Sequence, residues 1–195
     1  MWTPIGGIIM DVKEAIEKRR AYRSLEHVEI TEELVKDLGQ SAQLSPSCFN
    51  NQPWRYVFVY GEEMLSKMHE ALTGGNAWAK SAPLIIAVFS KPDFDCQIKE
   101  RDYYLFDTGM ATAFIILRAT ELGLVAHPIA GFDEGKVKEI LGIPNDRKVI
   151  TLVIVGKHMD TISPVLSENQ VVKEKQRPER KRIEEFLHLN RYGEH

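Results

Sequence analysis

The sequence predicts one globular domain of the α/β or α+β class. The chain has 195 residues, of which 44% are hydrophobic and 27% charged, a balance typical of folded proteins. Segments with helical periodicity alternate with short apolar segments, in the order helix, helix, strand, helix, strand, helix, strand, helix, strand. This length allows one sizeable core, which we expect to be stable without a disulfide or a metal ion.

The first two helices are indicated by apolar periodicity and by their capping residues. Asp11 is the predicted N-cap of the first helix, and Thr31 is that of the second, which runs to about Leu44. Residues 1–10 are apolar and Gly-rich without a period, and we interpret them as an N-terminal extension that packs on a neighbour or, alternatively, as a frayed end. A turn-rich loop follows the second helix.

The remaining elements follow the same two periodicities. They are predicted at 55–60 (strand), 61–72 (helix), 83–90 (strand), 105–122 (helix), 123–132 (strand and turn), 133–141 (helix, N-cap Asp133) and 148–157 (strand). The helix at 105–122 is apolar nearly all round, yet it is too short and too charged to span a bilayer comfortably. We therefore expect it to be buried in the core or at a subunit interface.

Basic residues are concentrated in two short segments, although the formal net charge is only −3. Residues 18–23, the first basic segment, hold four of them, and residues 173–182, the second basic segment, hold six. Arginine forks bind phosphate oxygens in bidentate fashion, but cations also stabilise a helix C-terminus or form a solvated surface. The second segment could complete a phosphate site, stay solvated or bind nucleic acid. The acidic remainder of the chain disfavours an extended nucleic-acid interface.

The two cysteines and six histidines indicate no metal site. Cys48 and Cys96 form no CxxC pair, no histidines have HxxxH spacing, and GxGxxG, P-loop and GxSxG motifs are absent. With no pattern of a secretory signal, a reducing, cytoplasmic setting is expected. Cys48 is interpreted as a structural or incidental thiol, with a reactive thiol as the less favoured alternative.

The loop at residues 45–54 is the most specific feature of the sequence. It contains two prolines and five short polar side chains, namely Ser45, Ser47, Asn50, Asn51 and Gln52. Such a surface can hydrogen-bond a flat ligand rich in heteroatoms. Residues 127–132 then place a glycine after a strand, where the backbone can approach a ring closely.

These motifs, in this order, resemble the FMN-dependent nitroreductase family. The family pattern Arg-Arg-Ser-x-Arg is matched at 19–23 and Pro-Ser-Ser-x-Asn-x-Gln-Pro-Trp at 46–54. Leu-Gly-Leu follows at 122–124, Pro-Ile-x-Gly-Phe at 128–132, and a basic stretch near the C-terminus, so that the match covers about residues 11–190. The resemblance implies an α+β fold, with a mostly antiparallel central sheet flanked by helices, in an intertwined homodimer.

The resemblance also implies two FMN molecules at the dimer interface, each held by both subunits. Arg19 and Arg20 would contact the phosphate and ribityl region, and Arg23 the N1 and O2 edge of the ring, where a cation stabilises the reduced flavin. Ala130 and Gly131 would offer backbone N–H groups to the N5 and O4 edge. The whole implied set is Arg19, Arg20, Ala21, Arg23, Pro46, Ser47, Cys48, Asn50, Gln52, Asn76, Pro128, Ile129, Ala130, Gly131, Arg180 and Lys181.

Two positions depart from the family pattern, and both lose a hydroxyl group. Ala21 replaces the usual serine beside the phosphate, and Cys48 replaces the second serine of the loop, whose residues would reach the flavin of the other subunit. In the second basic segment, Arg180 and Lys181 are favoured over Lys175 and Arg177 as the last phosphate contacts. Asn76 is similar to an asparagine that touches the ring in some members.

The implied activity is that of an NAD(P)H-dependent flavin oxidoreductase. NADH or NADPH would deliver a hydride to FMN, and a small acceptor such as a nitroaromatic or a quinone would take the electrons in a second half-reaction. No catalytic side chain, metal, membrane or nucleic acid is expected. Residues 1–195 would form one domain, with 157–195 as an arm that wraps the partner subunit. The alternatives are another flavin reaction, dehalogenation or dehydrogenation, and a non-catalytic protein that binds phosphate or RNA.

Overall fold

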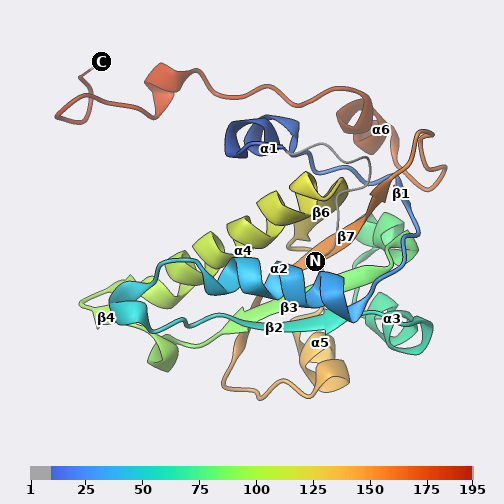
Figure 1. Cartoon of the computed structure of the whole chain (residues 1–195), viewed down its shortest axis with the longest axis horizontal. Helices are drawn as coiled ribbons and strands as arrows, with labels where there is room; N and C mark the ends of the chain where they lie inside the picture. The colour runs from blue at the N-terminus through green and yellow to red at the C-terminus, as the bar shows by residue number, and fades with distance from the viewer. Residues whose placement is uncertain (1–9, 195) are drawn as a thin grey trace.

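The computed structural model describes residues 10–194, and its centre is an antiparallel sheet (Figure 1). The strands are β1 (Leu25–Glu26), β2 (Arg55–Val59), β3 (Leu84–Ser90), β6 (Leu124–Ile129) and β7 (Lys148–His158). The long strand β7 pairs with β3 on one side and β6 on the other, β1 pairs with its C-terminal end, and β2 pairs with β3. The predicted mostly antiparallel sheet is therefore confirmed.

The predicted order of helices and strands is confirmed, with local additions. The helices are α1 (Val12–Lys18), α2 (Glu32–Gln43), α3 (Glu62–His69), α4 (Tyr103–Glu121), α5 (Glu134–Leu141) and α6 (Glu168–Lys175). The predicted caps are present, since Asp11, Thr31 and Asp133 each accept a hydrogen bond from the main-chain N–H three residues later. The elements not predicted from the sequence are β1, α6, the hairpin of β4 (Gln97–Ile98) and β5 (Arg101–Asp102), and the short 3₁₀ helices η1 (Cys48–Asn50), η2 (Gly74–Ser81), η3 (Pro92–Phe94) and η4 (Ile183–Glu185).

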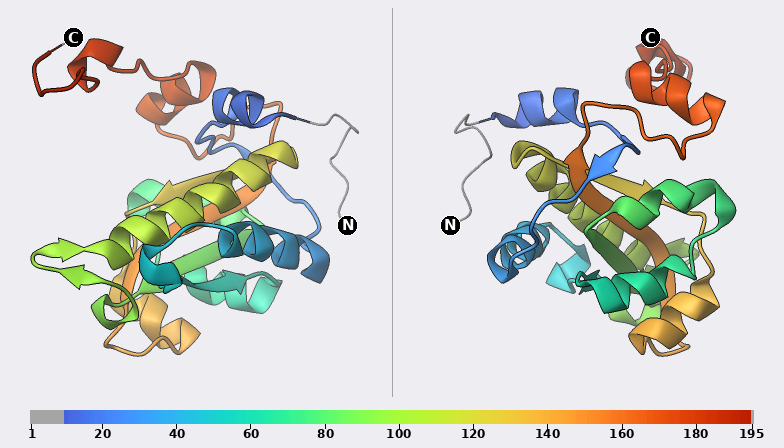
Figure 2. Two further views of the ribbon diagram at one scale, coloured as in Figure 1. Left: turned by 60° about the vertical axis from the view of Figure 1, so that its left-hand side comes forward. Right: turned by 90° about the vertical axis from the view of Figure 1, so that its right-hand side faces the viewer.

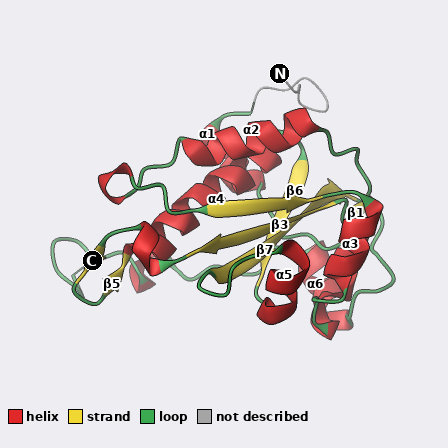
Figure 3. Ribbon diagram, turned by 90° about the horizontal axis from the view of Figure 1, so that it is seen from below, coloured by secondary structure: helices red, strands yellow, loops and turns green. Residues whose placement is uncertain are grey.

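Helices cover both faces of the sheet (Figure 3). On one face, α2 and α4 pack on the β3 side chains Leu84, Ile86 and Val88. On the other face, α3, η2 and α5 pack on Ile85 and Ala87. Two-sided burial explains why β3 is a continuous apolar run rather than an alternating one.

The long helix α4 is buried on one face only. Its buried side includes Asp107, Ala111 and Ile115, whereas Phe106, 62% exposed, and Phe114 remain on the outer side. The prediction that this helix is buried in the core is therefore confirmed for one side of α4. The alternative, burial at a subunit interface, stays a prediction for the exposed side. No helix within residues 10–194 is long and apolar enough to cross a membrane.

The C-terminal end of the chain departs from the compact body (Figure 2). The N-terminal extension expected at residues 1–10 lies, except for Met10, outside the described residues. At the other end, α6 lies near the end of α1, and the chain beyond α6 extends away from the sheet (Figure 2). This last segment exposes the large apolar side chains Ile183, Phe186, Leu187, Leu189 and Tyr192.

Candidate functional site

The two basic segments of the sequence meet in the folded chain. Arg20 donates hydrogen bonds to the main-chain carbonyls of Lys173 and Glu174, at 3.0 and 3.1 Å. Arg177 in turn donates to the carbonyls of Glu17 and Arg19 at the end of α1. Each guanidinium therefore binds the C-terminal end of a helix, where it also complements the helix dipole.

The buried carboxylate of Glu174 also connects the two basic segments. Glu174 is only 5% exposed, and its oxygens accept hydrogen bonds from the main-chain N–H groups of Arg23, at 3.0 Å, and Ser24, at 2.9 Å. His158 lies 3.4 Å from the same carboxylate. Because charged acceptors make strong hydrogen bonds, this contact locks α6 onto the segment that follows α1.

Basic side chains surround a small cavity between these segments, with a volume of about 160 Å³. Its lining residues are Arg19, Arg20, Ala21, Arg23, Lys173, Arg177, Pro178 and Arg180. None of these described lining residues is acidic. Burial lowers the pKa of Arg19, and the neighbouring cations Arg177 and Arg180 lower it further. An anion in this cavity, which we call the cationic cavity, would relieve that repulsion, so the donor set fits a phosphate group.

Arg23 connects the cationic cavity to a stack of aromatic rings. Its guanidinium lies 5.8 Å from the centre of the Trp78 ring, and Trp78 stacks on His127 at 4.7 Å. Burial lowers the pKa of His127 to about 4, so this imidazole is neutral at pH 7. Its Nδ1 lies 3.0 Å from the carbonyl oxygen of Tyr22, an acceptor, which requires the Nδ1–H tautomer. Burial likewise lowers the pKa of Arg23, while Glu174 opposes that shift.

Asn76 and Gly131 lie in direct contact beside this stack. The Asn76 amide and the Thr73 hydroxyl both donate to the Gly131 carbonyl, at 2.8 and 3.0 Å. A Cβ atom on residue 131 would lie 2.5 Å from Asn76 Nδ2 and 2.6 Å from Thr73 Oγ1. The glycine of the motif at 128–132 is therefore required by packing within the chain.

The other residues of that motif differ in exposure. Pro128 and Ala130 are exposed, whereas Ile129 is buried in the core between the sheet and η2. The buried Ile129 side chain supports the strand rather than facing a ligand.

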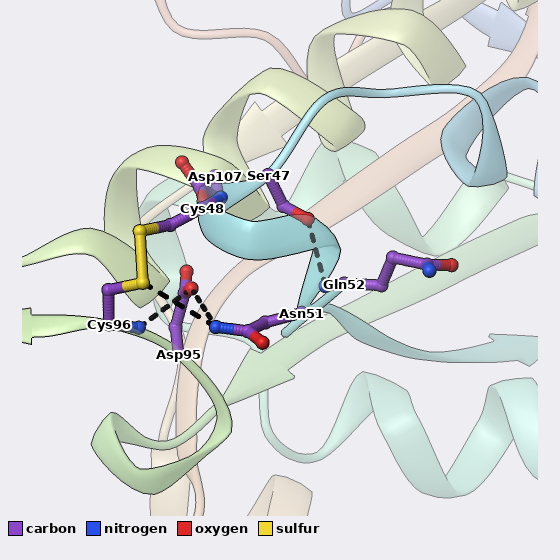
Figure 4. The surroundings of a disulfide bond; sticks show 7 residues. All are labelled: Ser47, Cys48, Asn51, Gln52, Asp95, Cys96 and Asp107. Carbon is purple, nitrogen blue, oxygen red and sulfur yellow. Dashed lines mark hydrogen bonds between the residues drawn. A yellow bond between two sulfur atoms is a disulfide. The ribbon is translucent and has the colours of Figure 1, made fainter.

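The loop at residues 45–54 holds its own conformation through hydrogen bonds (Figure 4). Ser47 Oγ accepts from the main-chain N–H of Gln52 at 2.9 Å, and Gln52 Nε2 donates to the Asn50 carbonyl. Phe49, Asn50 and Gln52 have φ angles of +48°, +59° and +50°. Positive φ is uncommon for residues other than glycine, so surrounding contacts must enforce this path.

The interpretation of Cys48 as a thiol is wrong, because Cys48 and Cys96 form a disulfide. The bond joins the loop to the segment before β4, 48 residues further along the chain. Asp95 lies close to both sulfur atoms, but sulfurs joined in a disulfide are not available as thiolate ligands for a metal ion. No sequence spacing indicated this pairing, since it depends on the unpredicted hairpin that carries Cys96 past the loop.

The structure divides the predicted site residues into separate groups. Arg19, Arg20, Ala21, Arg23 and Arg180 line the cationic cavity, and Asn76 and Gly131 lie near Trp78. Lys181 does not line the cavity. Arg177, the less favoured alternative, does line it, and so does Lys173, which the sequence did not single out. No local pattern in the sequence indicated these two residues, because Arg177 lies beyond the end of α6 and past Gln176, whose backbone is extended.

The loop residues Pro46, Ser47, Cys48, Asn50 and Gln52 form a separate group, and none of them lines the cationic cavity. They lie at the opposite end of the molecule from η2 and α6 (Figure 1).

The sheet, its helices and the cationic cavity define an α+β protein with a cavity lined by cationic side chains. The family model described as the nitroreductase family matches residues 16–157, so the chain belongs to the nitroreductase family. This membership confirms the family and the enzyme class, an oxidoreductase, that the motifs predicted.

Individual proteins show the same likeness. A protein of Methanothermobacter thermautotrophicus, provisionally named NADH dehydrogenase/NAD(P)H nitroreductase, is 31% identical over 152 residues, which are 75% of this chain and 77% of that protein. The crystal structure of an FMN-containing oxidoreductase superposes with a TM-score of 0.80 at 25% identity, over 93% of this chain and 92% of the other. A nitroreductase from Exiguobacterium sibiricum, solved in complex with FMN, has the same fold, with a TM-score of 0.70 at 23% identity, over 83% and 96% of the two chains.

Proposed function

We propose that the protein is an FMN-dependent oxidoreductase that uses NADH or NADPH to reduce small acceptors such as nitroaromatics and quinones. The observation that carries this proposal is the cationic cavity, in which two segments about 150 residues apart present cations to one phosphate-sized space. Two structural neighbours contain FMN, and NAD(P)H stands in the names of relatives. The cationic side chains of this chain's own cavity suit the phosphate group of FMN.

The arginines of the cavity have two different proposed roles, one structural and one in binding phosphate. Arg20 and Arg177 hold the two segments together through main-chain carbonyls, which leaves Arg19 and Arg180 as the proposed phosphate contacts. Arg23, next to Trp78, would face the N1 and O2 edge of the flavin ring. That edge gains negative charge when the flavin is reduced, and the guanidinium would stabilise this charge. Asn76 and the backbone at Ala130 and Gly131 would position the opposite edge.

Bound FMN would supply the redox chemistry, taking a hydride from NAD(P)H and giving two electrons to the acceptor in alternating half-reactions. The protein's part is to bind and orient the reactants. Neutral His127 and Trp78 stack on each other beside Arg23, and both rings are buried from solvent. We propose no side chain as a proton donor.

We further propose that the active form is a homodimer. The loop at 45–54 lies far from the cationic cavity within one chain, so a second copy would have to bring it to the flavin. Exposed apolar side chains on α1, on α4 and at the C-cap of α2 support such a pairing, and these include Val12, Ile16, Leu44, Phe106 and Phe114. The exposed apolar residues beyond α6 would form the arm on the partner.

Flavin binding and reduction test the proposal directly. Purified protein is expected to bind FMN, and anaerobic NADH or NADPH is expected to bleach its visible absorption in stopped flow. A panel of nitroaromatic and quinone acceptors should then restore the colour. Colourless protein that takes up no added FMN would overturn the proposal.

Variants locate the site. Arg19→Ala is expected to weaken FMN binding by about 10- to 100-fold, because a hydrogen bond to a charged group contributes about 1.5–3 kcal/mol. Arg182→Ala is the matched control, since that side chain is 83% exposed and lies outside the cavity. Equal losses in both variants would contradict the phosphate assignment.

Mixing two variants tests the shared site. Arg19→Ala and Asn50→Ala chains, refolded together, should form mixed dimers in which one of the two sites is intact. Because random pairing makes about half of the dimers mixed, recovery of FMN binding toward about a quarter of the wild-type amount is the expected result. Mixtures that bind no more than the separate variants would contradict a site built from two copies.

A further inference from the structure

The Cys48–Cys96 disulfide lies at the centre of the contacts that hold the loop at residues 45–54 in place (Figure 4). Three residues of this loop, Phe49, Asn50 and Gln52, have positive φ angles, a conformation that is unfavourable for side chains of this kind. Such a path persists only where other contacts over-determine it. The disulfide is the covalent one among those contacts.

The hydrogen bonds of the loop converge on the same point. The main-chain N–H of Cys48 donates to Asp107 Oδ2 at 2.6 Å, which ties the loop to α4. Asn51 Nδ2 donates to Asp95 Oδ1 at 3.2 Å and lies 3.5 Å from Cys96 Sγ. Asp95 Oδ1 also accepts from the main-chain N–H of Cys96 at 2.8 Å. Because Asp95 and Cys96 lie on the segment before β4, most of these contacts require that segment to stay against the loop.

Beyond these contacts the loop is anchored only at its ends, by buried Ser45 on one side and by buried Pro53 and Trp54 on the other. Phe49 is 89% exposed, and Asn50 and Asn51 are also exposed. The hairpin β4–β5 that follows Cys96 has only two residues in each strand and no buried residue. Cleaving the disulfide would therefore release the middle of the loop and the hairpin, which have little apolar burial of their own.

The sulfur atoms are accessible and lie beside acidic groups. Cys48 and Cys96 are both partly exposed, so a small dithiol can reach them. Asp95 Oδ2 is buried and accepts no hydrogen bond within residues 10–194, and it lies next to Asp107, which is 2% exposed. Burial raises the pKa of Asp107, and the Asp95 carboxyl raises it further. A proton shared by these two carboxyls would satisfy the buried oxygen.

We propose that Cys48–Cys96 is a reversible redox site whose oxidised form holds the loop at residues 45–54 in its binding conformation. In the oxidised protein the loop is ordered, and in the dithiol form it is mobile. The consequence for the active site rests on the proposed function, in which this loop contacts FMN: reduction of the disulfide lowers the affinity for FMN.

The redox step balances with a dithiol as the reductant. A thiolate of the reductant attacks one sulfur, which forms a mixed disulfide and releases the other cysteine as a thiolate. The second thiol of the reductant then displaces the remaining cysteine and closes its own disulfide. Two electrons pass to the protein, and the two protons of the reductant's thiols end on Cys48 and Cys96, with the Asp95 and Asp107 carboxyls as the nearest proton relay. A small-molecule disulfide reverses the reaction.

Hydrogen exchange of the full-length protein tests the proposal. Dithiothreitol is added to native protein, the cysteines are counted by alkylation and mass spectrometry, and amide exchange is followed in peptides that cover 45–54 and, as an internal control, β3. We expect two alkylated cysteines and exchange that is at least about tenfold faster in the loop but unchanged in β3. Removal of the reductant and addition of oxidised glutathione, a linear disulfide, should restore the slow exchange.

A double variant separates loss of the bond from side effects of the reductant. Cys48→Ser with Cys96→Ser is expected to show the fast loop exchange without reductant and no response to it. Cysteines that resist alkylation until the protein is denatured, or loop exchange that stays slow after reduction, would overturn the redox site.

A titration with FMN tests the link between the disulfide and the active site, independently of the hydrogen exchange. FMN affinity is expected to fall about tenfold on reduction of the wild type, and to stay unchanged when the double variant is treated with dithiothreitol. Equal affinity in both redox states would overturn the link to the active site. Failure of the oxidised protein to bind FMN at all would instead contradict the proposed function, while the exchange measurement still decides the redox site.

Discussion

The carboxylate of Glu174 accepts a hydrogen bond of 3.0 Å from the main-chain N–H of Arg23, a residue 151 positions earlier in the chain. The same carboxylate accepts from Ser24, and Arg20 caps the carbonyl of Glu174 itself. This buried group therefore decides where α6 lies, and with it the position of Arg177 and Arg180 beside Arg19.

We expect Glu174→Ala to destabilise the protein by about 3 kcal/mol, because two main-chain N–H groups lose a charged acceptor. FMN binding should weaken as well, since the second basic segment loses its attachment. Urea unfolding and a flavin titration measure the two effects. Glu179→Ala, an exposed acid of the same segment, should change neither, and a silent Glu174→Ala would contradict the assigned role.

Arg180 and Lys181 are neighbours in sequence but not in their relation to the cavity. Arg180→Ala is expected to weaken FMN binding about tenfold, since it removes a cation that lines the cationic cavity. Lys181→Ala should bind FMN like the wild type, because Lys181 does not line that space. Isothermal titration at low and at physiological salt compares them, and the reverse order of effects would show that the cavity is wrongly assigned.

Gly131→Ala tests the close contact with Asn76. The new Cβ would lie 2.5 Å from Asn76 Nδ2 and 2.6 Å from Thr73 Oγ1, so side chains must shift, at a cost of about 1–3 kcal/mol. Gly39→Ala provides the control, because no atom within 4 Å meets a Cβ there and alanine favours helix α2 by about 0.5–1 kcal/mol. Thermal unfolding should therefore shift in opposite directions in the two variants.

His127 makes the stability depend on pH below neutrality. Its pKa in the folded protein, about 4, lies below the ordinary value near 6.5, so the unfolded chain takes up a proton first as the pH falls. This contribution is complete above about pH 6.5 and is lost toward pH 4, by about 3 kcal/mol. His127→Asn keeps a donor for the Tyr22 carbonyl without the titration. Unfolding of both proteins at pH 7 and pH 4.5 should show a smaller decrease for the variant.

The contribution of Asp107 to stability depends on pH in the opposite direction to that of His127, because burial raises the pKa of Asp107 in the folded state. The favourable contribution is present below the ordinary aspartate pKa, near 4, and is lost as the pH rises through the folded value. Asp107→Asn should therefore stabilise the protein at pH 8, by about 1 kcal/mol, as the amide can donate to Asp95 Oδ2 and still accept from Cys48. The gain should shrink at pH 4, and a gain independent of pH would count against the shared proton.

The elements and the family were predictable because their signals are local. A cap at Asp11, Thr31 or Asp133 depends on that residue and the N–H three positions later, so spacing alone indicates it. The motifs at 19–23, 46–54 and 128–132 are likewise short and contiguous. The sequence therefore determined the order of helices and strands, the cation-rich segments and membership of the nitroreductase family.

Tertiary structure alone decided which distant residues share a site. It placed Lys173 and Arg177 beside Arg19, kept Lys181 out of the cavity, and joined Cys48 to Cys96. These outcomes depend on the path of the hairpin and of α6, two elements with weak local patterns. Their positions come from long-range contacts, such as that of Glu174 with Arg23, whose free energy appears only when the whole chain has folded.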